Sequence, residues 1–271
     1  MAEIIKTIVY GIVEGITEWL PISSTGHLIL LEELLPLNRS PEFLEMFRVV
    51  IQLGAILAVV LLYWERLFPF QFKKKPYIKE ETLFMWLKVI VACIPTIVIG
   101  MPFDDLFESL FYNYVCVAIV LFVFGVLFIL IERRNRDQTP KMETIAQIGY
   151  RTAFYIGLFQ LIAAIFPGTS RSGATILGAI LLGVSRTAAA EFTFFLAVPV
   201  MLGASLLKII KFGFDFTKME LSVLLIGMAT AFAVSVLAIR FLMGYIKKHD
   251  FKVFGWYRII LAIIVVLYMS L

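Results

Sequence analysis

The sequence has few charged residues for its length. Asp, Glu, Lys and Arg make up 16% of its 271 residues, whereas hydrophobic residues make up 61%. A soluble domain of ordinary composition carries about a quarter charged residues, so this chain is predicted to be a polytopic membrane protein. Its net charge of +4 comes mostly from loops between apolar runs. That pattern indicates membrane topology and anionic lipid headgroups, and nucleic acid is not expected as a partner.

Cysteine and histidine are also scarce, with two of each. Cys93 and Cys116 lie in apolar runs without a partner spacing, which is typical of inert packing residues. The sequence contains no Gly-rich phosphate loop, no paired Cys/His spacing and no HExxH motif. The opening apolar segment contains two glutamates and no clear cleavage site, so we expect it to be part of the mature protein.

Long apolar runs make up most of the sequence. Six of them have about the length needed to cross a bilayer, roughly 20 residues, at about 45–64, 83–102, 113–131, 190–208, 220–239 and 254–271. The acidic segment at 104–108, between the second and third of these runs, is expected to be a turn. Two further runs, 11–30 and 153–183, are interrupted by Pro21 and Pro167, each followed by polar residues. We therefore predict an all-α fold, with residues 1–271 forming a single membrane domain.

The two interrupted runs align with each other. Gly11, Pro21 and Ser24 match Gly157, Pro167 and Ser170 at a spacing of 146. Downstream segments match at a spacing of 149, as in Leu53-Gly54-Ala55 and Leu202-Gly203-Ala204. We expect two inverted repeats, at about 1–132 and 145–271, each a re-entrant helix pair followed by three transmembrane helices. Helices interrupted at corresponding positions of two halves indicate a binding site.

The distribution of basic residues predicts the topology of this arrangement. Loops at 65–82, 132–152, 184–189 and 240–253 fall on one side and hold 15 Lys and Arg residues, Lys73, Lys74 and Lys75 among them. The opposite side holds 5. Because cytoplasmic loops are rich in Lys and Arg, we expect both termini to lie outside. The first interrupted run then enters from the outside and the second from the cytoplasm.

Each interruption leads through polar residues into the start of a half-helix. These residues are Ser23, Ser24 and Thr25 in the first run, and Thr169, Ser170, Arg171 and Ser172 in the second. Helix N-termini present free N–H groups and a positive dipole, and so bind anions. The planar fork of donors on Arg171 suits phosphate, although a structural ion pair is the alternative role for this residue.

Two carboxylates and a histidine accompany the first interruption. Glu14 and Glu18 are four residues apart and share one face of a helix. In a low dielectric they need either a shared divalent cation, with Mg²⁺ a common partner of carboxylates and phosphates, or a proton on one of them. His27 is a candidate general acid or base, or an activator of a serine, with a purely structural role as the alternative.

The residues at both interruptions resemble one protein family. EGITEWLPISSTGH at 14–27 resembles the glutamate-rich and serine-rich signature of the bacterial undecaprenyl-diphosphatase (bacitracin-resistance) family, and PGTSRSGAT at 167–175 is similar to its second signature. VIQLGAILAV at 50–59 and SRTAAAEFTFFLAVP at 185–199 resemble its flanking segments. The resemblance covers essentially the whole chain.

This resemblance implies an enzyme that removes the terminal phosphate of undecaprenyl diphosphate at the outer face of the bacterial cytoplasmic membrane, using a divalent cation, Mg²⁺ or Ca²⁺. By position it implies a catalytic set of Glu14, Glu18, Ser24, His27 and Arg171, in which the two glutamates hold the metal. Ser23, Thr25, Thr169, Ser170 and Ser172 would contact substrate. The sequence leaves open a serine or a water nucleophile, the general base and a homo-oligomeric state. A transporter of lipid phosphate or a small anion is the alternative function, because inverted repeats with interrupted helices are transporter architecture.

Overall fold

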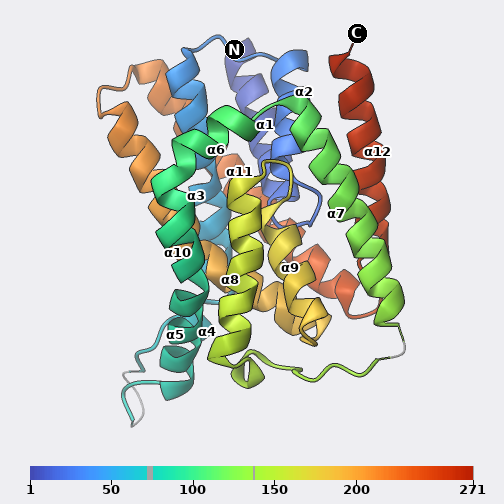
Figure 1. The fold of residues 1–271 in the computed structure, drawn as a ribbon. Coiled ribbons are helices and arrows are strands. Elements are labelled where there is room, and N and C mark those ends of the chain that lie inside the picture. The colour runs from blue at the N-terminus through green and yellow to red at the C-terminus, as the bar shows by residue number, and fades with distance from the viewer. Residues whose placement is uncertain (72–75, 137, 271) are drawn as a thin grey trace.

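The chain folds into a bundle of helices in the computed structural model, which describes residues 1–71, 76–136 and 138–270 (Figure 1). Lys73, Lys74 and Lys75 of the predicted basic loop lie outside these ranges. The described residues form no strand and only two isolated bridges, Phe70 with Ile78 and Met142 with Val184. The predicted all-α class is confirmed for the described part of the chain.

Six helical segments of the described chain are long and apolar enough to cross a membrane. They are α3 (Pro41–Leu62), α5 continued to α6 (Glu80–Phe111), α7 (Tyr114–Arg134), α10 (Arg186–Phe212), α11 (Lys218–Ile246) and α12 (Lys252–Met269). All six predicted spans are therefore present as helices. A short helix, α4 (Trp64–Leu67), follows α3, and a 3₁₀ turn (Ile145–Gln147) precedes α8 (Tyr150–Ile165).

The second of these segments is longer than its predicted span. Helix α5 proper covers Glu80–Pro95, a π-helical stretch follows over Thr96–Gly100, and a 3₁₀ turn over Met101–Phe103 leads into α6 (Asp104–Phe111). The acidic segment at 104–108, which we expected to be a turn, is thus helical. Its two aspartates occupy the first turn of α6, where the helix dipole favours negative charge.

The two interrupted runs form pairs of shorter helices. The first pair is α1 (Ala2–Thr17) and α2 (Ser24–Leu34), and the second is α8 (Tyr150–Ile165) and α9 (Arg171–Leu181). Helix α1 packs against α11, and α8 packs against α5. A Cβ atom on Gly11 would lie 2.8 Å from the Gly227 carbonyl oxygen, and one on Gly157 would lie 2.3 Å from that of Ala92. These matched glycines therefore allow the close helix contacts.

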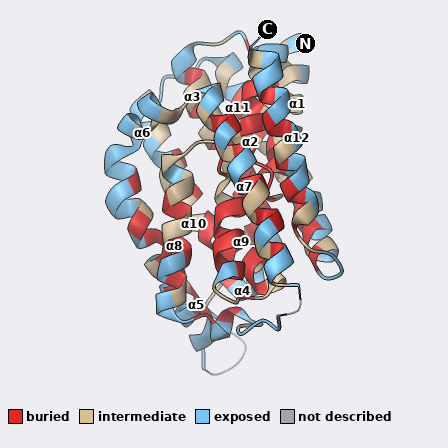
Figure 2. Cartoon of the chain, turned by 45° about the vertical axis from the view of Figure 1, so that its right-hand side comes forward, coloured by how far each residue is buried: buried red, intermediate tan, exposed pale blue. Residues whose placement is uncertain are grey.

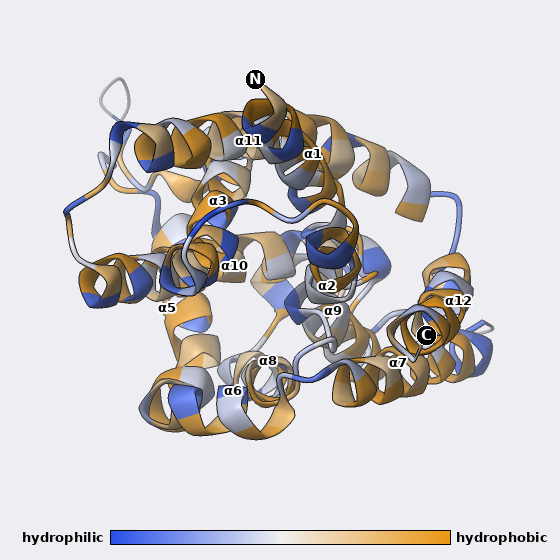
Figure 3. Ribbon diagram, turned by 90° about the horizontal axis from the view of Figure 1, so that it is seen from above, coloured by the Kyte–Doolittle hydropathy of each residue, from blue (hydrophilic) through white to orange (hydrophobic). Residues whose placement is uncertain are grey.

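The most buried helix of the bundle is α9. Every residue from Ser172 to Ile180 is buried, and Figure 2 shows this helix in red inside a shell of more exposed helices. The outer helices expose large apolar side chains instead, and Leu237 is 67% exposed. Seen from the end that carries the termini, the ribbons of α7 and α12 are coloured largely as hydrophobic (Figure 3). This distribution suits a lipid environment.

The two ends of the bundle differ in charge. Both termini lie at one end, and the loops that join α7 to α8 and α11 to α12 lie at the other (Figure 1). The loops at the second end carry Arg136, Lys141, Lys247 and Lys248. The structure therefore places the termini opposite these two loops, and the side of the membrane expected for each end stays a prediction.

Candidate active site

Two serines in an unusual backbone conformation mark the starts of α2 and α9. Ser23 has a φ of 73° and Ser170 a φ of 66°, and they are the only described non-glycine residues with positive φ. Each serine caps its helix: the Ser23 Oγ accepts from Gly26 N at 3.3 Å, and the Ser170 Oγ accepts from Gly173 N at 3.2 Å. Such a conformation costs on the order of 1 kcal/mol or more and is found mostly at functional sites.

The two caps correct the alignment of the interruptions by one residue. The sequence matched Ser24 with Ser170, whereas the capping positions match Ser23 with Ser170 and Gly26 with Gly173. Ser24 then corresponds to Arg171, since each is the first residue of its helix. The reason is that helix geometry depends on the capping hydrogen bond, which the sequence comparison did not use.

Glu18 connects the start of α2 with the start of α9. Its Oε1 accepts a hydrogen bond from Arg171 Nη2 at 2.9 Å, across 153 residues of sequence. Its Oε2 accepts from Ser24 Oγ at 3.3 Å, and its backbone oxygen accepts from Ser172 Oγ at 2.9 Å. One carboxylate thus contacts both the serine and the arginine that the sequence predicted to be catalytic. A carboxylate in this position is suited to accept the hydroxyl proton of Ser24.

Arg171 is held in place by α10. Its Nη1 donates to the Thr193 backbone oxygen at 3.1 Å, and its guanidinium carbon lies 6.0 Å from the ring centroid of Trp19. Thr193 Oγ1 donates to Thr175 Oγ1 at 2.9 Å, and Thr175 Oγ1 donates to the Arg171 backbone oxygen at 2.9 Å. These two buried threonines were missed by the sequence analysis, although threonines within apolar runs are a recognisable signal.

Arg171 also has one N–H donor that makes no hydrogen bond within the described structure. Arg171 Nε is buried and has no hydrogen-bond partner among the described residues. A buried donor without a partner is costly, by about 1–3 kcal/mol. The group is therefore available to an anion that enters between the interruptions.

Glu14 is fully buried one helical turn before Glu18. Neither of its carboxylate oxygens has a hydrogen-bond partner within the described ranges, so this side chain needs a cation or a proton. No group of three or more His, Cys, Asp or Glu residues suited to a metal occurs in the described parts of the chain. Two carboxylates fit a cation only if the remaining ligands come from substrate phosphate or water.

His27 lies beside Ser23 rather than against Ser24. Its Nδ1 is 2.7 Å from the Ser23 backbone oxygen, and its Nε2 is 2.7 Å from the Tyr257 hydroxyl. Because a carbonyl oxygen only accepts, Nδ1 carries a proton, and in the neutral ring Nε2 accepts from Tyr257. No hydrogen bond joins His27 to Ser24 in the described structure. Tyr257, on α12, was not identified from the sequence.

The other predicted substrate contacts surround the same interruptions. Ser170 Oγ and Ser172 Oγ lie 3.2 Å apart, and the Thr169 hydroxyl donates to the Phe166 backbone oxygen at 2.7 Å. Thr25 is half-buried in the first turn of α2. Six hydroxyl groups, that of Ser24 included, thus lie within the two turns that begin α2 and α9, but those of Thr169 and Ser172 already donate to backbone oxygens.

A second arginine, Arg258 on α12, binds both interruptions at once. Its Nη2 donates to the backbone oxygens of Gly168 at 3.0 Å and Thr169 at 2.8 Å, and its Nη1 donates to that of Pro21 at 3.4 Å. The residue is fully buried, and no carboxylate lies within 4 Å of it in the described chain. Arg258 was not identified from the sequence, although a single arginine inside an apolar span signals function.

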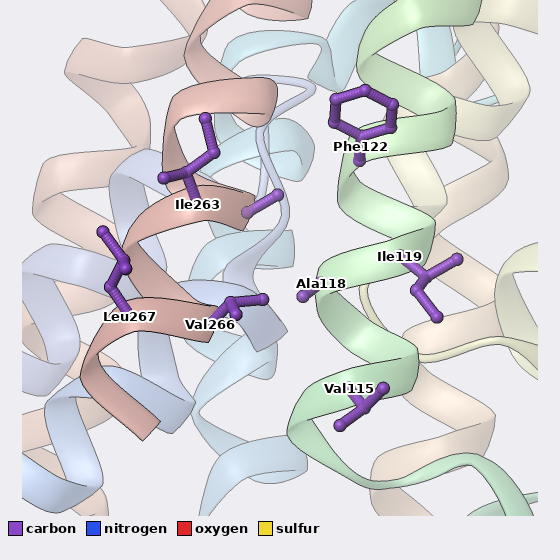
Figure 4. Close-up of a pocket in the computed structure, with 8 residues that line it drawn as sticks. Val115, Ala118, Ile119, Phe122, Ile263, Val266 and Leu267 are labelled. Carbon is purple, nitrogen blue, oxygen red and sulfur yellow. The ribbon is translucent and has the colours of Figure 1, made fainter. Parts of the chain in front are cut away.

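The bundle also has a groove without polar groups. It lies between α7 and α12, has a volume of about 360 Å³ and is lined by side chains that include Val115, Ile119, Phe122, Ile263 and Leu267 (Figure 4). None of the predicted site residues lines it. This groove therefore offers no polar side chain that could bind a phosphate.

Comparison with known proteins agrees with the expected family. A family model described as Bacitracin resistance protein BacA matches residues 7–264. The undecaprenyl-diphosphatase of Desulfitobacterium hafniense is 66% identical over 270 residues, covering 100% of this chain and 97% of that protein. Those of Acetivibrio thermocellus and Enterococcus faecalis are 63% and 62% identical, covering 99% and 98% of this chain and 98% and 96% of the respective relatives. The chain therefore belongs to the BacA family of bacitracin resistance proteins.

Proposed function

We propose that this protein is an integral membrane phosphatase that hydrolyses undecaprenyl diphosphate to undecaprenyl phosphate and phosphate, and so recycles a lipid carrier for cell-wall synthesis. Relatives that are 55–66% identical to it carry the name undecaprenyl-diphosphatase. The observation that carries the proposal is the contact of Glu18 with both Ser24 and Arg171. It joins a hydroxyl, a proton acceptor and a phosphate-binding cation at one point.

In the proposed reaction Ser24 Oγ attacks the terminal phosphorus. Glu18 accepts the hydroxyl proton, a new Oγ–P bond forms, and the P–O bond of the anhydride breaks, so that undecaprenyl phosphate leaves. Water then hydrolyses the phosphoserine and releases phosphate. In the variant of this mechanism, water attacks directly and Ser24 only binds the phosphate. Detection of a phosphoserine during turnover distinguishes the two.

Arg171 and the two helix starts supply the stabilisation of charge. The transferred phosphoryl group carries negative charge that positioned donors stabilise. The unpartnered Nε of Arg171 and the free N–H groups of the first turns of α2 and α9 are such donors. An incoming phosphate would compete with Glu18 for the guanidinium of Arg171 and release that carboxylate to act as a base.

A divalent cation, Mg²⁺ or Ca²⁺, belongs to the proposal. Glu14 and Glu18 would hold it, because the Glu14 oxygens are buried and have no hydrogen-bond partner in the described part of the chain. When bound, such a cation neutralises the charge of the diphosphate. In its absence a proton on one of the two carboxylates is required, since Glu18 is paired with Arg171 whereas the buried Glu14 has no partner among the described residues.

The two-repeat organisation and the topology are also part of the proposal. The repeat is supported by the second helix of each pair, α2 and α9, which begins with the same capped conformation at Ser23 and Ser170. The topology is supported by the termini, which lie opposite the loops that join α7 to α8 and α11 to α12 (Figure 1). If the basic end faces the cytoplasm, both termini and the opening of the site face the outer side of the bacterial cytoplasmic membrane.

Phosphate release tests this function. Purified protein in detergent, supplied with undecaprenyl diphosphate, is expected to release phosphate and to lose this activity with a chelator. Detergent contains no sealed compartment, so a transporter of lipid phosphate or a small anion would release none. Movement of substrate across liposomes without hydrolysis would contradict the proposal and support the transporter.

A further inference from the structure

A polar hollow lies at the end of the bundle that carries the basic loops. It has a volume of about 470 Å³ and is formed by the turn between α11 and α12 together with residues that follow α7 and begin α10. Its lining includes Arg136, Arg186, Tyr245, Lys247, Lys248 and His249. We call it the basic hollow. None of the residues assigned above to the reaction lines it.

One wall of the basic hollow is fixed by a buried ion pair. The carboxylate of Glu132 is wholly buried and pairs with Arg186, whose Nε donates to its two oxygens at 2.9 and 3.2 Å. The backbone N–H of Phe251 donates to the same carboxylate at 3.1 Å. The hydrogen bonds satisfy the buried charge and hold the α11–α12 turn against α7 and α10. The hollow is therefore a built feature of the fold.

The remaining charges of the basic hollow are mostly positive. Asp250 is paired with Lys252, whose Nζ lies 2.9 Å from its Oδ2. Lys247 and Lys248 are exposed, and no carboxylate of the described residues lies within 4 Å of either ammonium. With Glu132 neutralised by Arg186, the hollow keeps at least these two uncompensated cations. It is suited to an anion.

A ladder of rings leads from the hollow to the apolar surface. The ring of His249 stacks on Tyr245 with centroids 4.5 Å apart, and Tyr245 stacks on Phe241 at 5.9 Å. Phe241 is 58% exposed, and Val253, which lines the hollow, is 57% exposed. Amphipathic rings of this kind lie at the boundary between headgroups and hydrocarbon. The anion site thus continues directly into a surface for acyl chains.

We propose that the basic hollow binds the phosphate of an anionic phospholipid, with Lys247 and Lys248 as its main cations and the ring ladder against an acyl chain. Basic pockets between transmembrane helices are suited to anionic lipid headgroups. Inorganic phosphate offers the same anionic group, but it would leave the exposed Phe241 and Val253 without a partner. The lipid is therefore the occupant, and the inference does not depend on the proposed phosphatase activity.

Native mass spectrometry of the purified full chain in detergent tests the site. Dioleoyl phosphatidylglycerol and dioleoyl phosphatidylcholine are titrated separately, so that only the headgroup charge differs. Each lysine near anionic lipid contributes about 1 kcal/mol, so a Lys247→Gln/Lys248→Gln variant is expected to bind phosphatidylglycerol about 30-fold more weakly. A Lys247→Arg/Lys248→Arg variant keeps the charge and should bind like the wild type.

A matched control removes two charges at the same end without touching the hollow. Arg133 and Arg151 are both exposed and do not line it, so Arg133→Gln/Arg151→Gln should bind within about threefold of the wild type. Equal binding of the two lipids, or full binding by the lysine-to-glutamine variant, would overturn the proposal. Displacement of the lipid by excess inorganic phosphate would also overturn it and indicate a site for free anions.

Discussion

Arg171 and Glu18, 153 residues apart in the chain, form an ion pair of 2.9 Å between the starts of the two interrupted helices. The pair is largely buried, with side-chain exposures of 14% and 7%. Glu18 also accepts from Ser24, so the pair connects a predicted phosphate-binding group with a predicted nucleophile.

Replacing Arg171 by lysine should lower the rate of phosphate release about 100- to 1,000-fold, the usual cost of removing one positioned donor to a transition state. The ammonium keeps the charge but loses the planar fork, including the Nε that has no partner among the described residues. Kinetics with undecaprenyl diphosphate measures the effect, with Arg133→Lys as the control. A loss below tenfold would show that charge alone suffices at this position.

Ser24→Ala should abolish a phosphoserine intermediate and lower the rate at least 1,000-fold if the serine is the nucleophile. Rapid acid quenching with labelled substrate detects the intermediate, and the exposed Ser109 provides a control in Ser109→Ala. A residual activity within about tenfold of wild type would instead support direct attack by water.

Glu14→Gln separates the two explanations for the buried carboxylate. If Glu14 holds a divalent cation, the neutral amide should raise the Mg²⁺ concentration needed for half-maximal activity at least tenfold, because amides are weaker ligands for hard cations than carboxylates. A metal titration after chelator treatment measures this value. An unchanged value with good activity would indicate that Glu14 is protonated and binds no metal.

Tyr257→Phe removes the hydroxyl that lies 2.7 Å from His27 Nε2 and changes little else. Loss of one hydrogen bond costs about 1 kcal/mol. If the orientation of His27 matters for turnover, we therefore expect the rate of phosphate release to fall about fivefold. The same substitution at the exposed Tyr268 should have no effect. Equal rates for both variants over a range of pH would show that the Tyr257–His27 contact has no part in catalysis.

Arg258→Met should destabilise the protein by about 3 kcal/mol or more, because the backbone oxygens of Pro21, Gly168 and Thr169 would lose a buried donor. Thermal unfolding in detergent measures the loss. Arg258→Lys keeps one cationic donor and should recover part of it. A stability equal to that of the wild type in Arg258→Met would show that water or another group satisfies these oxygens.

Several features of this fold were predictable because they depend on local pattern. The lengths of the apolar runs gave the six spans, and Pro21 and Pro167 marked the interruptions. The acidic segment at 104–108 was predicted wrongly as a turn. Its charged residues were taken as a loop signal, whereas aspartates at a helix start stabilise that helix.

The sequence by itself determined the all-α membrane class, the family and the two polar segments that form the candidate site, since these follow from composition and contiguous motifs. Only the tertiary structure decided that Ser23 is the cap equivalent to Ser170 and that Glu18 pairs with Arg171. It also decided that, on α12, Tyr257 contacts His27 and Arg258 contacts both interruptions. These contacts join segments about 90 to 240 residues apart. Such contacts depend on how helices pack, and no local periodicity encodes that.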